Sequence, residues 1–505
     1  MRILSGINKI FSTSVIYNFA KRVYLILCSA FKETFFYKIL ARDLNEKSYE
    51  NSFMYKTEQF FSKILVFIEK IINKILKREE KKKNPILEDI ADTSLFLKAF
   101  KMNNYKEGWA FLVFALLLML TGIMPTMVVL GLCLIVFLCA FFDLDFTSKV
   151  KNTKFLITDA FILLFLVALF YSRFISNDVQ KNKIFLVYFV FVAFYFAVNF
   201  FISNKERLFI SLKAFSLSSA LVGAVGMVQF LTGSYKTTTW TDTQMFEDIQ
   251  GRLVATFENP NVFGEYLLLA IPVTLAMILI SKSKIWKFFF SCILGVSCVC
   301  MILTYSRGCW LGLIFSIFLI VLMLFPKLIL PLMVIAPFSI FVMPESIIDR
   351  ITSIGNMNDG STVFRVYIWR ATVNMLQKYG ISGIGLGTDC YEKYYSHYAY
   401  DAVLAPHSHN TFLHVMCESG IFGLLVFVLL LYFLLRQLFV AYSKTKNSDL
   451  KIVCGCLIAG FGGLMVQGMF DNVFYNYRMY MIFFAIFSIA CSAYKIYKKE
   501  NENSD

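Results

Sequence analysis

From residue 109 onward, the chain alternates long apolar runs with short polar segments. Runs such as "WAFLVFALLLMLTGIM" and "IFLVYFVFVAFYFAVNFFI" carry no charge over nearly the ~20 residues that an α-helix needs to cross a bilayer. The pattern predicts an all-α polytopic membrane protein with about 12 transmembrane helices. The expected spans are 109–124, 126–142, 155–171, 184–202, 208–232, 260–280, 288–305, 309–325, 328–343, 410–435, 452–470 and 479–494.

Composition agrees with this class. The chain is 58% hydrophobic and only 16% charged, whereas soluble domains are about 45–50% apolar and about 25% charged. Most of the 12 cysteines fall inside predicted spans, and no Cys-x-x-Cys spacing occurs. We therefore interpret them as core residues, with neither a disulfide framework nor a zinc site. The short run "VYLILCSAF" near the N-terminus does not predict a cleaved signal peptide.

The net charge of +15 is distributed in a way that points to a membrane and not to nucleic acid. The first 108 residues hold 20 of the 49 Lys and Arg. The positive-inside rule then places both termini in the cytoplasm. The predicted order is a basic cytoplasmic region (1–108), nine spans (109–343), one large external loop between spans 9 and 10 (344–408), three spans (409–494) and a cytoplasmic tail (495–505).

The N-terminal region contains one amphipathic segment, "FFSKILVFIEKIINKILK" at 60–77. Its apolar residues share one helical face and its lysines the other, as in helices that bind the anionic inner leaflet. A helix packed on the protein's own cytoplasmic surface has the same pattern. We therefore leave both interpretations open.

Two arginines stand at predicted outer membrane boundaries. Arg252 lies in "QGRLVATFENPNVFGEYLLL", which enters the sixth span through Asn259 as a helix cap and Pro260 at the first helical position. Arg307 lies between two spans that share scarcely any linker, so Ser306-Arg307-Gly308 is expected to form a hairpin turn. A single arginine beside a span usually reaches to lipid headgroups. Two arginines on the same side of the membrane as a histidine cluster favour a functional role.

The predicted external loop adds a helix, "STVFRVYIWRATVNMLQKYG", with Arg365 and Trp369 on one face. The glycines Gly383, Gly385 and Gly387 follow it. A nucleotide-binding loop would follow a strand within a βαβ unit, so we interpret these glycines as a turn after a helix.

All four histidines lie between His397 and His414, three of them in "APHSHNTFLHVMCESGIFG". We expect Ser408 to cap the tenth span and the helix to begin near His409. A helix N-terminus attracts anions and disfavours imidazolium, which keeps a histidine ready to accept a proton. Metal binding by His407, His409, His414 and Glu418 is one alternative, although these ligands do not obviously converge. Histidines that only stabilise a buried loop are another.

Three acidic residues and two glycines on the outer side complete the candidates. Glu265 and Glu418 lie inside spans, where an ionisable group is usually functional or paired. Asp471 follows the eleventh span and could orient the histidine or bind an acceptor. A structural role is equally compatible with each of the three. Gly420 and Gly423 are expected to permit close helix packing.

Three short patterns resemble the O-antigen ligase and O-antigen polymerase superfamily. The first is His409-Asn410 followed, after nine intervening residues, by Gly420-x-x-Gly423. The second is Arg307-x-x-x-Leu311, and the third is Arg252 ahead of "ENPN". The resemblance covers roughly residues 210–480, and the spans and external loop are similar to the family's GT-C-like glycosyltransferase architecture. The region before residue 108 has no counterpart in it.

The resemblance implies an inverting, metal-independent glycosyltransferase. Such proteins move a glycan from a polyprenyl-diphosphate carrier to an acceptor hydroxyl on the outer face of the cytoplasmic membrane. It implies His409 as catalytic base and Arg252 and Arg307 as ligands of the diphosphate, with no metal or other cofactor. Weaker substrate contacts are expected from further residues: Arg365, His407, Asn410, Glu418, Asp471 and Glu265.

Two other classes stay open, a transporter or flippase of lipid-linked glycans and a metal-dependent membrane hydrolase. A transporter would be expected to carry charge near the bilayer midplane, whereas the charges here lie at the outer edge. The expected partners are the lipid-linked donor, membrane lipids and an acceptor, which is a second glycan, a lipid or a protein. Nothing in the sequence identifies the acceptor or the sugar.

Overall fold

The computed structural model describes residues 105–141, 156–176, 181–235, 251–329, 331–332, 345–352, 360–401 and 403–502, and every element in these ranges is helical. Nine of the described helices are long and apolar enough to cross a membrane. They are α11 (Ile157–Ile175), α12 (Lys181–Phe201), α13 (Lys205–Thr232), α14 (Pro260–Ile280), α15 (Lys284–Leu303), α16 (Arg307–Leu324), α21 (Thr411–Lys444), α22 (Ser448–Gly468) and α23 (Tyr477–Glu502). The all-α multi-pass class is confirmed.

Two shorter apolar helices, α8 (Tyr105–Leu120) and α9 (Thr126–Phe141), correspond to the first two predicted spans. A 3₁₀ turn, η2 (Pro326–Leu328), follows α16. Eleven of the twelve predicted ranges therefore overlap a helix. The range 328–343 and the segment 60–77 lie largely or wholly outside the described residues, so the count of twelve remains a prediction.

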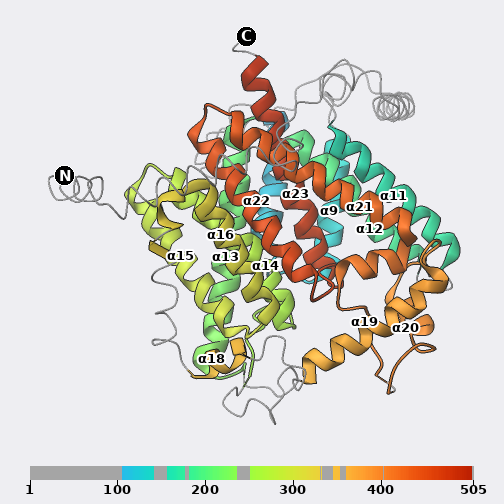
Figure 1. The fold of residues 1–505 in the computed structure, drawn as a ribbon. Coiled ribbons are helices and arrows are strands. Elements are labelled where there is room, and N and C mark those ends of the chain that lie inside the picture. The colour runs from blue at the N-terminus through green and yellow to red at the C-terminus, as the bar shows by residue number, and fades with distance from the viewer. Residues whose placement is uncertain are drawn as a thin grey trace, which may run out of the picture.

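Helix α14 occupies the centre of the bundle, with α13, α15, α16, α22 and α23 packed around it (Figure 1). It begins as the sequence predicts. The Asn259 side chain accepts hydrogen bonds from the N–H groups of Asn261 (2.8 Å) and Val262 (3.4 Å), and Pro260 is the first helical residue. This cap holds the end of α14 that contributes to the site described below.

Helices α16 and α22 cross at a pair of glycines. A Cβ added at Gly312 would lie 2.5 Å from the carbonyl oxygen of Gly463, and one added at Gly463 would lie 2.6 Å from that of Gly312. Since real Cβ atoms do not approach so closely, only glycine allows these two backbones to touch.

Gly420 has a different role from the expected one. Its φ of 67° and ψ of −173° interrupt α21, so it breaks the helix where the prediction had it mediate close helix packing. The freed groups are satisfied by the turn that follows the helix ending at Tyr379: Ile421 N–H donates to Gly380 O (2.8 Å), and Ile384 N–H donates to Cys417 O (2.7 Å). A break in an apolar helix persists only where such partners are supplied.

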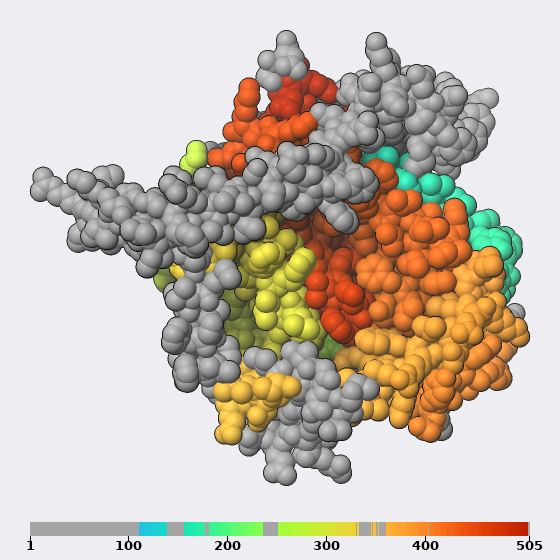
Figure 2. Space-filling model, viewed as in Figure 1, coloured from blue at the N-terminus to red at the C-terminus, as the bar shows by residue number. Residues whose placement is uncertain are grey.

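Among the described residues, three more α-helices lie between α16 and α21, namely α18 (Glu345–Thr352), α19 (Gly360–Tyr379) and α20 (Thr388–Tyr395). They gather at the end of the bundle opposite the C-terminus (Figure 1). Helices α19 and α20 form a small second core with the start of α21, built on buried side chains such as Ile368, Met375 and Tyr391. Figure 2 shows α19 and α20, in light orange, continuous with the orange surface of α21.

Candidate active site

The loop before α21 has an unexpected local structure. The helix begins at Thr411 and not at His409, and its cap is Asn410, whose side chain accepts from Leu413 N–H (3.0 Å). The expected cap, Ser408, instead donates to Asn410 O (2.8 Å). His409 has a φ of 46°, a left-handed conformation that a helix cannot include. The indole N–H of Trp369 in α19 donates to the His409 carbonyl (3.1 Å) and helps to hold it there.

This loop is bound to the segment after α22. The Asn410 amide donates to Met469 O (2.9 Å). The Thr411 hydroxyl donates to Asp471 O (3.0 Å) and accepts from Val473 N–H (3.0 Å). These three bonds bring the side chain of Asp471 against that of His409, although 62 residues separate them in sequence.

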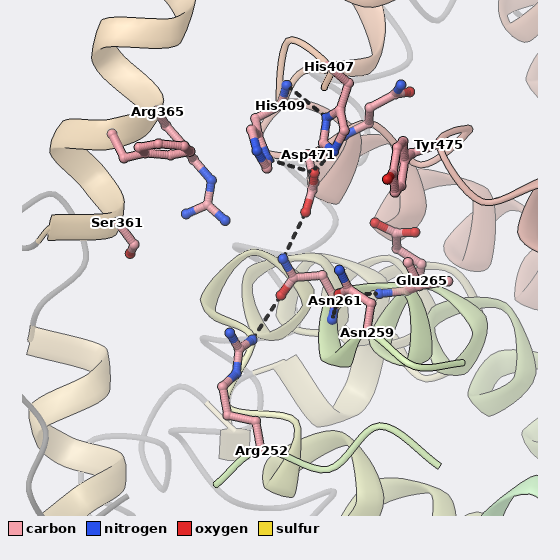
Figure 3. Close-up of a pocket in the computed structure, with 13 residues that line it drawn as sticks. Arg252, Asn259, Asn261, Glu265, Ser361, Arg365, His407, His409, Asp471 and Tyr475 are labelled. Atoms are coloured by element: carbon pink, nitrogen blue, oxygen red, sulfur yellow. Dashed lines mark hydrogen bonds and ion pairs between the residues drawn. The ribbon is translucent and has the colours of Figure 1, made fainter. Parts of the chain in front are cut away.

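A continuous chain of hydrogen bonds then connects a histidine to an arginine (Figure 3). His409 Nδ1 lies 3.0 Å from Asp471 Oδ1. The other oxygen, Oδ2, accepts from the Asn261 amide (2.8 Å), and Asn261 Oδ1 accepts from Nη2 of Arg252 (2.8 Å). Arg252 also donates through Nε to Thr304 O (2.8 Å). An asparagine suits the middle of this chain because it both donates and accepts.

The charges of this cluster are set by burial and by its neighbours. Burial, followed by the proximity of His409, lowers the pKa of His407 to about 3, so His407 is neutral at pH 7. Its Nδ1 accepts from the backbone N–H of His409 (3.2 Å), as a neutral imidazole can. Burial alone would raise the pKa of Asp471, but the adjacent His409 ring, which donates to the carboxylate through Nδ1, holds that pKa well below its usual range. Asp471 is therefore a carboxylate.

These groups line a cavity of about 390 Å³, a size typical of small-molecule sites. Six predicted site residues contribute to its wall: Arg252, Glu265, Arg365, His407, His409 and Asp471. Seven further residues of the wall were not among the predicted site residues: Asn259, Asn261, Val262, Ser361, Phe364, Asn472 and Tyr475. The cavity lies between the first turns of α14 and α19 and the loops before α21 and after α22 (Figure 3).

Arg307 does not line the cavity itself but contacts a residue that does. It is the first residue of α16, and its guanidinium donates to the hydroxyl of Ser361, which lines the cavity. The predicted hairpin turn is displaced, because the chain reverses at Thr304 to Ser306, where Tyr305 has a φ of 48°. Gly308 is therefore inside α16, where its missing side chain makes room for Gln467.

Two further predicted residues do not line this cavity. Asn410 caps α21, as described above. Glu418 is buried in α21, where it accepts from Tyr188 OH (3.1 Å) and Gly387 N–H (3.2 Å). With His414, 4.0 Å away, it lines a second cavity of about 30 Å³. The predicted turn at Gly383, Gly385 and Gly387 is observed, with positive φ at all three.

The cluster also contains a candidate metal-ligand set. The ligand atoms of His407, His409 and Asp471 lie within 4.8 Å of one another. The set differs from the one considered from sequence, since Asp471 takes the place of His414 and Glu418. Two histidines and a carboxylate suit zinc or iron, but the nearby cationic side chains of Arg252 and Arg365 oppose a further positive charge.

Fold and site together define a multi-pass helical membrane protein with a polar cavity that combines a histidine–carboxylate pair with arginines. Residues 290–428 match the family model described as O-Antigen ligase. The match runs from α15 into α21 and includes Arg307, Arg365, His407 and His409. The resemblance to the O-antigen ligase and polymerase superfamily, whose members are glycosyltransferases, is thereby confirmed. No curated protein matches the chain at a significant level.

Proposed function

We propose that this protein is an inverting, metal-independent glycosyltransferase that moves a glycan from a polyprenyl-diphosphate carrier to an acceptor hydroxyl. The observation that carries the proposal is the 3.0 Å contact between His409 and Asp471 in a cavity also lined by Arg252 and Arg365. A base and anion-binding groups therefore share one space, as a displacement at a phosphorylated sugar carbon requires.

His409 is the proposed base. Because the Asp471 carboxylate accepts from Nδ1, it favours the tautomer with the proton on that nitrogen, which leaves the lone pair of Nε2 available. The acceptor hydroxyl gives its proton to Nε2, and its oxygen forms the new bond to the sugar C1. The bond from C1 to the diphosphate oxygen breaks, and the diphosphate leaves with the electron pair. One displacement of this kind inverts the anomeric centre.

The arginines stabilise the leaving group. Guanidinium stays charged at any working pH and binds phosphate oxygens through two parallel N–H groups. Arg252 and Arg365 line the cavity directly, and Arg307 acts from behind through Ser361. Together they can neutralise the charge that builds on the diphosphate, the role that a metal ion plays in many soluble enzymes.

Asn261 is the proposed positioning residue between these two functions. It bonds the arginine of the leaving-group side to the carboxylate of the base side. We infer that this bond sets the Asp471 carboxylate in the plane that His409 needs.

The position of the site in the bundle fits an outer-face reaction. The cavity lies at the end opposite the C-terminus. If the C-terminus is cytoplasmic, as the charge distribution predicts, the cavity opens outside the cytoplasmic membrane. The acceptor is a lipid-linked repeat in a polymerase, a lipid in a ligase or a protein hydroxyl in an oligosaccharyltransferase.

The experiment is transfer from a polyprenyl-diphosphate-linked glycan in proteoliposomes. His409→Ala is expected to lower the initial rate by about 10²–10⁴-fold, the usual contribution of a general base. Arg252→Ala is expected to lower it by about 10²–10³-fold. His397→Ala is the matched control, because His397 is exposed in the same region of the chain. Full activity of His409→Ala would contradict the proposal.

A metal-dependent hydrolase is the second candidate, favoured by the convergence of His407, His409 and Asp471. The two are separated by repeating the assay after EDTA treatment and dialysis. The transferase retains its rate. A loss that zinc restores, with water in place of the sugar acceptor, would establish the hydrolase.

A further inference from the structure

The cavity is chemically divided on either side of the His409–Asp471 pair. Arg365 and Arg252 lie on one side, and Tyr475 and Glu265 lie on the other (Figure 3). A diphosphate needs the cationic side. The opposite side offers an aromatic ring and a buried carboxyl group and has no arginine among its labelled residues, so it suits a different ligand.

Tyr475 presents its ring to this second side. Tyr475 is 43% exposed, although residues 471–474 directly before it are buried. One face of the ring is held by His407, with ring centroids 4.5 Å apart. An exposed ring fixed in a cavity wall gives a flat apolar surface onto which the C–H face of a sugar can pack.

Glu265 supplies the polar half of this subsite. It is buried in α14, and its Oε1 accepts from the Gln467 amide (3.1 Å). Its Oε2 has no hydrogen-bond partner among the described residues. A buried acceptor without a partner is costly, and this one belongs to the cavity wall beside Tyr475. A ligand hydroxyl is the group that would satisfy it.

We propose that Tyr475 and Glu265 form the acceptor subsite, and that it takes an uncharged sugar residue. The ring packs on the sugar, and Glu265 accepts from a sugar hydroxyl. A second hydroxyl then lies toward His409, between the two sides. The inference rests on the proposed transferase function and names the acceptor class that the residues themselves select, since an acidic sugar would have to bury its carboxylate on the side of the cavity away from Arg252 and Arg365.

The test measures the two sides separately on the full-length protein in nanodiscs. Farnesyl diphosphate, labelled with tritium, probes the cationic side by equilibrium binding. With that side saturated, methyl glucoside and methyl galactoside probe the acceptor side by saturation-transfer-difference NMR, and methyl glucuronide is the charged counterpart. The variants are Tyr475→Ala, Tyr475→Phe, Glu265→Gln and Arg252→Ala.

Tyr475→Ala is expected to weaken binding of the neutral glycosides about tenfold and to leave the farnesyl diphosphate Kd within about twofold. Tyr475→Phe keeps the ring and should bind both probes, while Arg252→Ala should lose only the diphosphate. Glu265→Gln should weaken binding of the neutral glycosides, because an amide N–H replaces one of the two acceptor oxygens, and the wild type should reject the glucuronide. Because Tyr475 is exposed, its variants test the subsite even if Glu265→Gln misfolds.

Three results would overturn the subsite: no saturation transfer from either neutral glycoside, equal binding of glucoside and glucuronide by the wild type, or loss of both probes together in Tyr475→Ala. Failure of the wild type to bind farnesyl diphosphate, or normal binding by Arg252→Ala, would count against the proposed function instead. The two failures are therefore distinguishable.

Discussion

Two buried aspartates in this protein have similar numbers of hydrogen bonds but different surroundings. Asp159, near the start of α11, accepts from Tyr195 OH (2.5 Å) and Leu156 N–H (2.7 Å), and Lys495 lies 3.7 Å away. Asp471 accepts from Asn261 (2.8 Å) and from its neighbour's N–H (2.9 Å), and it contacts His409.

The two aspartates differ in what their hydrogen-bond partners contact. The partners of Asp159 belong to α11, α12 and α23, so its bonds hold three helices together. The partners of Asp471 line a cavity, and one of them has a second ring nitrogen available for chemistry. A buried carboxylate is therefore structural or functional according to whether its partners reach a space that a ligand can enter.

The largest effect on the transfer rate is expected from Asp471→Asn, which tests whether this aspartate is functional. An amide N–H aimed at His409 Nδ1 would favour the opposite tautomer, with the proton on Nε2, so the base would be occupied. We expect the transfer rate to fall by about 10²-fold with the protein still folded. Initial rates in proteoliposomes, with size-exclusion profiles as the folding control, decide this. A rate near wild type would place Asp471 with Asp159 as a structural residue.

Asn261→Leu should have a smaller effect on the same chain of bonds. Leucine is of similar size but neither donates to Asp471 nor accepts from Arg252, so both side chains lose one partner. A rate loss of about tenfold is expected. Asn261→Asp is the paired variant, and it should be worse because it sets a carboxylate against that of Asp471. Rates near wild type for both variants would show that Asn261 contributes only volume.

Asp159→Asn should have the opposite pattern of effects, a loss of stability with little change in the transfer rate. Its amide would place an N–H against either Tyr195 OH or Leu156 N–H, so a loss of about 1–3 kcal/mol in stability is expected. The transfer rate per folded molecule should stay within about twofold. Thermal inactivation midpoints measure the loss of stability, and transfer rates normalised to the amount of folded protein measure turnover. Tyr195→Phe removes the same bond from the opposite side and should behave alike. A specific loss of turnover would make this cluster functional.

The last prediction concerns stability alone, as a pH dependence that comes from His407. Because the folded pKa, about 3, lies below the ordinary value of 6.5, the unfolded chain binds the proton more readily. The contribution is fully present above pH 6.5 and is lost as the pH falls toward 3. Between pH 7.5 and 5 it amounts to about 2 kcal/mol. In His407→Asn the fall in thermal midpoint over this interval should shrink, whereas an unchanged fall would show that His407 is not buried neutral.

Two wrong local predictions, the cap of α21 and the role of Gly420, have one common cause. Ser408 and Asn410 are both good cap residues, and the choice between them depends on His409, whose backbone is held by Trp369 from a distant helix. Gly420 likewise breaks α21 because the turn after α19 supplies bonds to the freed groups. Neither outcome is encoded in a local window of residues.

The site shows the same division. Arg252, Arg365 and the histidines could be singled out because charged and titratable groups are rare in this chain and cluster at apolar boundaries. Asn261 and Tyr475 could not, because asparagine and tyrosine at helix ends are ordinary residues there. Asn261 matters only through Asp471, 210 positions away.

The sequence by itself determined the membrane class, the positions of the spans that the structure describes, and the family resemblance. The length of an apolar run decides whether a helix can cross a bilayer, and that length depends only on consecutive residues. Only the tertiary structure decided which groups meet in the cavity. Packing of α14, α19, α21 and α22 sets those distances, and a base, its orienting carboxylate and its arginine function only when they lie within hydrogen-bond reach.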